Sequence, residues 1–145
     1  TPLYSSAASD VYKRQLLGGV EDFAAELCET MSRSTGSVCA VTDRDTVIAV
    51  AGGSKRELMG KRITPELEQI MESRKIYQYT GEGQPLQVTE GIDSLLTTVA
   101  APILAEGDLL GLVLFISSDP AAVTGDTEYK LAQTIAAFLG RHMES

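Results

Sequence analysis

Two apolar runs, Thr97–Leu104 and Leu109–Ser117, constrain the fold of this chain more than any other feature. The four residues between them, Ala105-Glu106-Gly107-Asp108, are typical of a turn, so the runs predict a long β-hairpin. Apolar residues follow one another in both runs instead of alternating with polar ones. Alternation of apolar and polar residues is typical of a sheet with one solvent-exposed face, so continuous apolarity indicates strands that are covered on both faces.

A second pair of strands is predicted earlier in the chain, where Val38–Val41 and Val47–Ala51 flank the polar turn Asp43–Asp45. A glycine pair breaks the second run. A capping-box pattern follows, in which Ser54 is expected to cap a short helix and Glu57 to reach back to it. The block therefore predicts strand, turn, strand, glycine hinge and helix start.

Helical periodicity marks both ends of the chain and two segments between them. The apolar residues of 16–33 and of 126–143 fall on one side of a helix in each case. A short helix is predicted over about 54–59, and another begins with Thr64 as its cap and Pro65 in its first turn. The apolar stripes consist of Val20, Phe23, Ala24, Leu27, Cys28 and Met31 in the first helix and of Leu131, Ile135, Phe138 and Leu139 in the last.

Two short strands, at about 76–79 and 84–89, complete the expected elements, and Pro85 confines the start of the second to a sheet edge. Pro102 indicates an edge or bulge within the long hairpin. Strands joined by hairpins, with helices at both ends, predict an α+β domain on a central antiparallel sheet. We expect the terminal helices on one face and the short helices on the other. GAF or PAS-like sensor modules have this layout, and roadblock-type interaction domains share much of it.

Four segments resemble one known family. They are VCAVTDRDTVIAVAGGSKRE (38–57), QPLQVTEGID (84–93), APILAEGDLLGLVLF (101–115) and AAFLGRHMES (136–145). Together they resemble the C-terminal GAF domains of the stage V sporulation protein T family, transcriptional regulators of spore-forming bacteria. The resemblance covers roughly residues 16–145 and is weakest over Tyr77–Glu82.

The resemblance implies a regulatory role without catalysis or a cofactor. In this family an N-terminal domain binds DNA, while the GAF domain assembles the regulator and senses a signal. Only the second role is expected of this chain. The implied partners are further copies of itself, in a dimer or a higher even-numbered oligomer, and a small-molecule effector of unknown identity. DNA is expected to be bound only through the N-terminal domain, which is missing here.

The first fifteen residues are expected to lie outside the domain. SSAASDVYKRQ (5–15) resembles the translation of a transposase adapter used in preparing sequencing libraries, and a natural disordered tail is the alternative. We therefore predict a non-native tail over 1–15 and one GAF-like domain over 16–145.

Charge and composition exclude several classes of function. The net charge of −8 repels phosphate backbones, so nucleic acid is not expected to bind this chain directly. No apolar run is long enough to span a membrane. Cys28 and Cys39 both fall within apolar patterns, which predicts reduced core residues of a cytoplasmic protein.

The turn around Gly52 and Gly53 is the best candidate for ligand binding. Glycines allow close backbone approach, and the start of a helix offers free N–H groups to an anion. Lysines and arginines follow in an otherwise acidic chain. A hinge and helix cap with solvated lysines explains the same residues without a ligand. The candidate ligand-binding residues are Gly52, Gly53, Ser54, Lys55, Lys61 and Ile63.

Catalytic and metal-binding patterns are scarce. His142, the single histidine, lies near the C-terminus, where a cation favours the helix dipole. It has no second histidine or paired cysteines with which to form a metal site. Some GAF-fold proteins reduce methionine sulfoxide with cysteines, but Cys28 and Cys39 do not follow that arrangement. We expect no catalytic residue and no metal ligand.

The terminal helices are the expected contact surface between copies of the chain. Each carries an apolar stripe, and terminal helices of GAF-type domains commonly pair across a two-fold axis. The candidate interface residues are Phe23, Leu27, Leu131, Ile135, Phe138 and Leu139.

Overall fold

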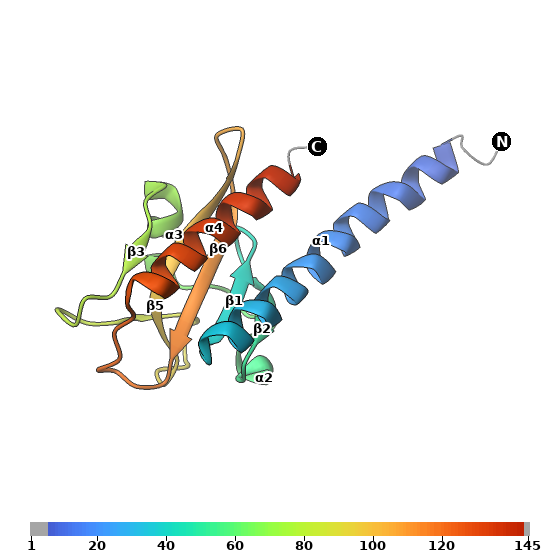
Figure 1. The fold of residues 1–145 in the computed structure, drawn as a ribbon. Helices are drawn as coiled ribbons and strands as arrows, with labels where there is room; N and C mark the ends of the chain where they lie inside the picture. The colour runs from blue at the N-terminus through green and yellow to red at the C-terminus, as the bar shows by residue number, and fades with distance from the viewer. Residues whose placement is uncertain (1–5, 144–145) are drawn as a thin grey trace.

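A computed structural model describes the backbone of residues 6–143 and the side chains of residues 21–142. A six-stranded sheet lies between two layers of helices (Figure 1). The helices are α1 (Ser6–Thr35), α2 (Lys55–Leu58), α3 (Pro65–Ser73) and α4 (Asp126–Met143). The strands are β1 (Val38–Thr42), β2 (Val47–Ala51), β3 (Tyr77–Gln78), β4 (Leu86–Gln87), β5 (Leu96–Ala105) and β6 (Asp108–Ser117).

The sheet is antiparallel and has the order β2-β1-β6-β5-β3, with β4 pairing β5 beside this path. The predicted long hairpin is confirmed: β5 and β6 pair in a register that places Val99 opposite Phe115. Its turn has left-handed backbone at Glu106 and Gly107, with φ of 53° and 86°. The predicted hairpin of β1 and β2 is also confirmed. The central position of β1, β6 and β5 explains why these strands are apolar throughout.

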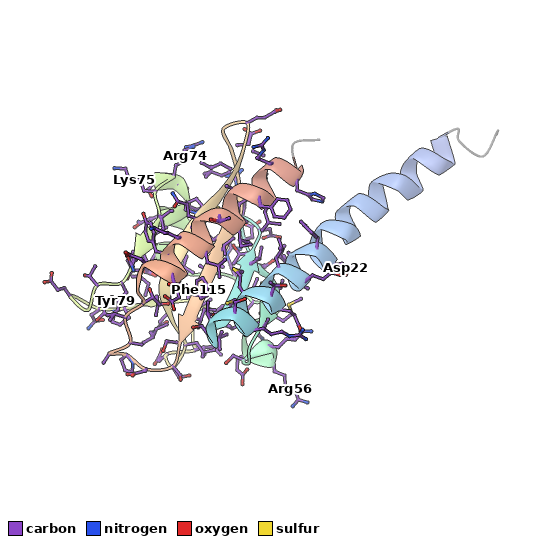
Figure 2. The ribbon with its side chains drawn as sticks, in the orientation of Figure 1. Asp22, Arg56, Arg74, Lys75, Tyr79 and Phe115 are labelled. Atoms are coloured by element: carbon purple, nitrogen blue, oxygen red, sulfur yellow. The ribbon has the colours of Figure 1, made fainter. Side chains whose placement is uncertain are left out.

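One layer consists of the two terminal helices, as expected. Their buried residues share a core cluster with alternate residues of the strands, and Phe115 lies fully buried in this cluster (Figure 2). The opposite residues of the same strands form a second cluster with Leu58 of α2 and with Leu67 and Met71 of α3. Both faces of the sheet are therefore covered, and the predicted α+β arrangement is confirmed. None of the helices in the described part of the chain combines the length and apolar character that a membrane span needs.

Two glycines let neighbouring elements approach closely. A Cβ atom at Gly111 of β6 would collide with the carbonyl oxygen of Thr42 in β1. A Cβ atom at Gly140 of α4 would collide with the carbonyl oxygen of Leu104 in β5. Helix α4 therefore packs unusually close to the backbone of β5.

The structure corrects the prediction of a capping box at Ser54. Ser54 has left-handed backbone, with φ of 63°, and its side chain makes no capping hydrogen bond. A cap needs extended backbone to aim its oxygen at the first turn, so this geometry excludes the predicted bond. At Thr64 the prediction is confirmed, because its backbone is extended and its Oγ1 accepts a hydrogen bond from the amide of Leu67 at 3.4 Å.

Two predicted boundaries also differ from the structure. Helix α1 begins at Ser6, ten residues before the expected Leu16, and its first part extends beyond the body of the domain (Figure 1). The expected tail thus continues the helical backbone over 6–15, while 1–5 lie outside the described residues. The strand predicted over 84–89 is only the two residues of β4, which pair with the start of β5.

Candidate functional site

The predicted site residues occupy two different places. Gly52 lies against the turn between α1 and β1: a Cβ atom there would be 2.7 Å from the carbonyl oxygen of Ser37 and would collide with Oγ of Ser32. Gly53 and Ser54 follow with φ of 135° and 63°. Lys55 opens α2, which is a single turn of four residues and is too short to provide an anion site at its N-terminus. This turn has a packing role that explains its glycines.

Lys61 and Ile63 lie elsewhere, at a cavity of about 340 Å³ beside the start of α3. The other candidate residues, Gly52 to Lys55, are not among those that line it. Loop residues and α3 form its walls, and no residue of the central strands contributes. The lining consists of Lys61, Arg62, Ile63, Pro65, Glu68, Thr89 and Glu90.

Hydrogen bonds between distant segments fix the walls of this cavity. The amide of Ile63 donates to the carbonyl of Asp45 at 3.0 Å, and the amide of Thr64 donates to the carbonyl of Val88 at 3.1 Å. The hydroxyl of Thr64 donates to the carbonyl of Gln87 at 2.9 Å. These amides are already bonded within the chain. An anion in the cavity would therefore be recognised by the side chains of Lys61 and Arg62.

Charges of both signs surround the cavity. Arg62 forms one long ion pair with Glu68, with Nη2 and Oε1 3.9 Å apart, and the Arg62 side chain is 74% exposed. Such an exposed pair contributes little to stability, so the guanidinium can turn towards a ligand at small cost. Glu90 also lines the cavity and is an acidic residue that was not among the candidates from the sequence.

Thr89 is another lining residue that was not among the candidates from the sequence. It is only 2% exposed, and its Oγ1 has no hydrogen-bond partner among the described residues. An unpaired buried hydroxyl is costly, which makes Thr89 a candidate contact for a polar ligand group. Nothing in the sequence around Thr89 distinguishes it from an ordinary loop threonine.

The two cysteines are buried thiols in the core under α1. Burial raises the pKa of Cys28 far above its ordinary value, and electrostatic interactions with Cys39 and Glu29 raise it further. Burial also raises the pKa of Cys39 to about 12, although a hydrogen bond with the Thr35 side chain lowers it. The thiolate is the reactive form, so neither side chain is prepared for nucleophilic chemistry. Among the described residues, no group of three or more His, Cys, Asp or Glu side chains could hold a metal ion.

The predicted interface residues divide into a buried and an outward-facing set. Ile135 and Leu139 are 9% and 1% exposed and belong to the core of the single chain. Phe138, on the same helix, is 48% exposed. Its ring meets that of Phe23, and Phe23 also stacks on His142 with ring centroids 4.5 Å apart. Phe23, Leu27 and Leu131 are partly buried against the core.

With this geometry established, comparison with known proteins is informative. The family described as "Stage V sporulation protein T C-terminal, transcription factor" matches residues 19–144. The chain belongs to this family. Stage V sporulation protein T of Bacillus subtilis (strain 168) is 36% identical over 124 residues, which cover 85% of this chain and 68% of that protein. The resemblance inferred from the sequence segments is therefore confirmed.

Solved structures place this member of the family within the GAF fold. The cofactor binding GAF domain of the nutrient sensor CodY from Clostridium difficile has a TM-score of 0.57 at 13% identity, covering 93% of this chain and 97% of that one. The type II free methionine-R-sulfoxide reductase of Thermoplasma acidophilum has a TM-score of 0.61 at 14% identity, covering 85% and 94%. At such low identity these likenesses concern the fold alone, and they favour the GAF prediction over the roadblock-type layout.

Proposed function

We propose that this chain is the non-enzymatic regulatory domain of a sporulation transcription regulator. It assembles the regulator through its terminal helices and responds to a small anionic effector. Membership of the transcription factor family supports the regulatory role. The observation that carries the assembly role is Phe138, a large apolar side chain 48% exposed beside the contact of α1 with α4.

Assembly would cover this aromatic surface. Apolar surface removed from water stabilises association, and a two-fold arrangement would let the same patch on each copy meet itself. Phe23 of α1 contacts Phe138. Leu27 of α1 and Leu131 of α4 are, like Phe23, partly buried residues of the terminal helices. A dimer or a higher even-numbered oligomer follows from such a self-complementary surface.

Site-directed cross-linking tests the proposed face. Phe138→Cys adds one exposed thiol, whereas Cys28 and Cys39 are buried. A short bismaleimide should then link two copies covalently. Met59→Cys is the matched control, because Met59 is 41% exposed and follows α2, whose Leu58 packs on the face of the sheet opposite the terminal helices. Cross-linking that is equal for both variants would contradict the proposed face.

The cavity at Lys61 is the proposed effector site. Two cations and the unpaired buried hydroxyl of Thr89 suit a carboxylate or phosphate group. A ligand that binds the native state raises the melting temperature by mass action. In a thermal-shift screen of anions and amino acids, a hit should be lost with Lys61→Ala and kept with Lys130→Ala, since Lys130 lies on α4.

DNA binding belongs in this proposal to a separate N-terminal domain. The phosphate backbone of DNA repels a chain of net charge −8. In a gel-shift experiment at physiological salt, residues 1–145 alone should leave a duplex unretarded. Retardation by this chain would place DNA contacts within the domain itself.

A ligand-free interaction scaffold is the second candidate function. The observation that favours it is the continuous apolar cluster between the sheet and α3, together with an effector cavity that no central strand lines. A broad thermal-shift screen in which no compound raises the melting temperature, while Phe138→Cys still cross-links, would favour the ligand-free scaffold over the effector-binding domain.

A further inference from the structure

A groove of about 410 Å³ lies on the α4 side of the sheet, away from the cavity at Lys61. Its floor is apolar and is formed by Ile76, Ala101, Leu104 and Ala136. Its rim carries Arg74, from the end of α3, and Arg141, from α4. An apolar concavity of a few hundred Å³ with a few polar groups at fixed places is typical of a small-molecule site.

The fold leaves this groove open for two reasons. Strand β3 pairs only with Val99 and Ala100 of β5, so in the described structure no strand pairs with the other edge of β5, the one away from β6, beyond Ala100. The second reason is the small size of the α4 residues beside β5. Ala136 and Ala137 line the groove, and larger side chains at these positions would fill it. Gly140 meanwhile holds α4 close to the carbonyl of Leu104.

Both charged residues at the rim are cations, in a chain whose net charge is −8. No carboxylate lines the groove, and within the described part of the chain neither guanidinium forms an ion pair. Nη2 of Arg74 donates to the carbonyl of Gly107 at 3.0 Å, which ties the guanidinium to the turn between β5 and β6. Its remaining N–H groups are available to an anion.

The backbone of Arg74 adds an independent observation. Arg74 follows α3 as its C-cap, with left-handed backbone and φ of 59°. Glycine is the residue usually found in this conformation at the end of a helix, because a side chain there is strained. Strained positions gather at functional sites. Arg74 thus places a long cationic side chain, instead of a glycine, at the mouth of the apolar groove.

We infer that this groove binds a small amphipathic carboxylate. The apolar body of the ligand lies on Ile76, Ala101 and Leu104, and its carboxylate meets the guanidinium groups of Arg74 and Arg141. Charge-assisted hydrogen bonds from arginine to a carboxylate are about twice as strong as neutral ones. The site lies across the sheet from the proposed effector cavity, so it does not depend on that proposal.

A titration of the ¹⁵N-labelled full chain with octanoate, followed by amide chemical shifts, tests the site. Saturable shifts should concentrate at 74–76, 101–104 and 133–141. Octanol, the neutral probe of matched length, and acetate, the anion without an apolar body, should each bind at least about tenfold more weakly.

Three variants locate the binding groups. Arg141→Gln should weaken octanoate binding at least about fivefold. Since the Arg141 side chain makes no hydrogen bond or ion pair within the described residues, the fold should be unaffected. Ala137→Leu should block the groove from an exposed helical position. Arg56→Gln removes the same charge from α2 and should bind octanoate as the unaltered chain does. Figure 2 shows Arg56 and Arg74 at opposite ends of the molecule.

Several results would overturn the inference. Octanoate binding that is unchanged in both Arg141→Gln and Ala137→Leu would show that the groove is not the site. Equal binding of octanol would remove the role of the arginines. The site would be refuted if octanoate caused no saturable shift below its micelle concentration. Shifts in the groove that depend on protein concentration alone would also refute it, because they would assign the groove to a second copy of the chain.

Discussion

The ring of Phe138 meets the ring of Phe23 edge to face, with centroids 5.5 Å apart and planes inclined at 82°. This contact joins α4 to α1 at the surface and leaves Phe138 48% exposed. Edge-to-face pairs contribute beyond the area they bury, so the two rings fix each other's orientation. The pair therefore forms an ordered aromatic surface, which the proposed assembly would cover.

Phe138→Glu should disrupt assembly while leaving the domain folded. Nearly half of the side chain is exposed, so the substituted carboxylate can stay in water in the separated chain but would be buried at a contact between copies. We expect at least about a tenfold weaker self-association, as the burial of an unpaired charge is costly. Sedimentation measures the association, and circular dichroism checks the fold.

Met59→Glu is the matched control for this variant. Met59 is 41% exposed, next to α2. The substitution adds the same charge at a similar exposure, next to a helix that packs on the face of the sheet opposite the terminal helices. Assembly should be unchanged, and equal weakening by both variants would attribute the effect to net charge instead of the aromatic pair.

Gly111→Ala should destabilise the domain by about 2 kcal/mol or more, in the range of overpacked cores. The added Cβ would collide with the backbone carbonyl of Thr42, and backbone in the centre of a sheet cannot move aside as a flexible side chain can. Gly125→Ala is the control, because the nearest atom to a Cβ there is Oε2 of Glu128 at 3.9 Å. Urea unfolding compares the two, and equal stability of both variants would refute the close packing of β1 against β6.

The buried thiols should make stability depend on pH in the alkaline range. Burial raises the pKa of Cys39 from 9.0 to about 12 and also raises that of Cys28. Below about pH 8 both thiols are neutral in the folded and unfolded chain, so their contribution to stability is complete. As the pH rises through 9, the unfolded chain loses thiol protons that the folded chain keeps. The free energy of unfolding should therefore fall by about 1.4 kcal/mol per thiol between pH 8 and 10.

Urea unfolding of the unaltered chain and of Cys39→Ala at these two pH values isolates this effect. Between pH 8 and 10 the free energy of unfolding should fall less for Cys39→Ala than for the unaltered chain, because one thiol no longer titrates. This comparison does not depend on the absolute stability of the variant. The same burial predicts slow labelling by a thiol reagent at pH 8 and rapid labelling in denaturant. Fast labelling of the native chain would contradict the buried, unreactive state of the cysteines.

Deleting residues 1–15 should leave the melting temperature within about one or two degrees, as expected of a terminal segment with few buried contacts. Among the residues of α1 whose side chains the structure describes, 21–35, the first that is buried in the core is Ala24. A loss of several degrees would show that the segment belongs to the fold and would contradict its interpretation as a non-native tail.

Much of the architecture could be predicted because the pattern of apolar residues reports burial directly. Continuous apolarity in β5 and β6 correctly indicated a sheet covered on both faces. Thr64 was a correct cap because the following proline fixes the first turn of α3. Ser54 has the same chemistry, but glycines precede it and the chain adopts left-handed backbone there, which no capping pattern specifies.

The candidate site was harder to predict because it depends on which loops meet in space. The glycine turn and Lys61 are close in sequence, yet only the latter lines the cavity. Thr89 joins Ile63 through an isolated antiparallel bridge between distant segments, which sequence spacing does not indicate. Helical periodicity likewise selected Ile135 and Phe138 together, although the first faces the sheet and the second faces outward.

The mass of the chain in solution tests the central claim most directly. Sedimentation equilibrium of residues 1–145 at about 100 µM, a concentration at which even weak assembly is measurable, gives that mass without labels. We predict a dimer or a higher even-numbered oligomer that Phe138→Glu shifts towards the single-chain mass of 15.5 kDa. A chain that sediments at 15.5 kDa without any substitution would contradict the proposal that this domain assembles the regulator.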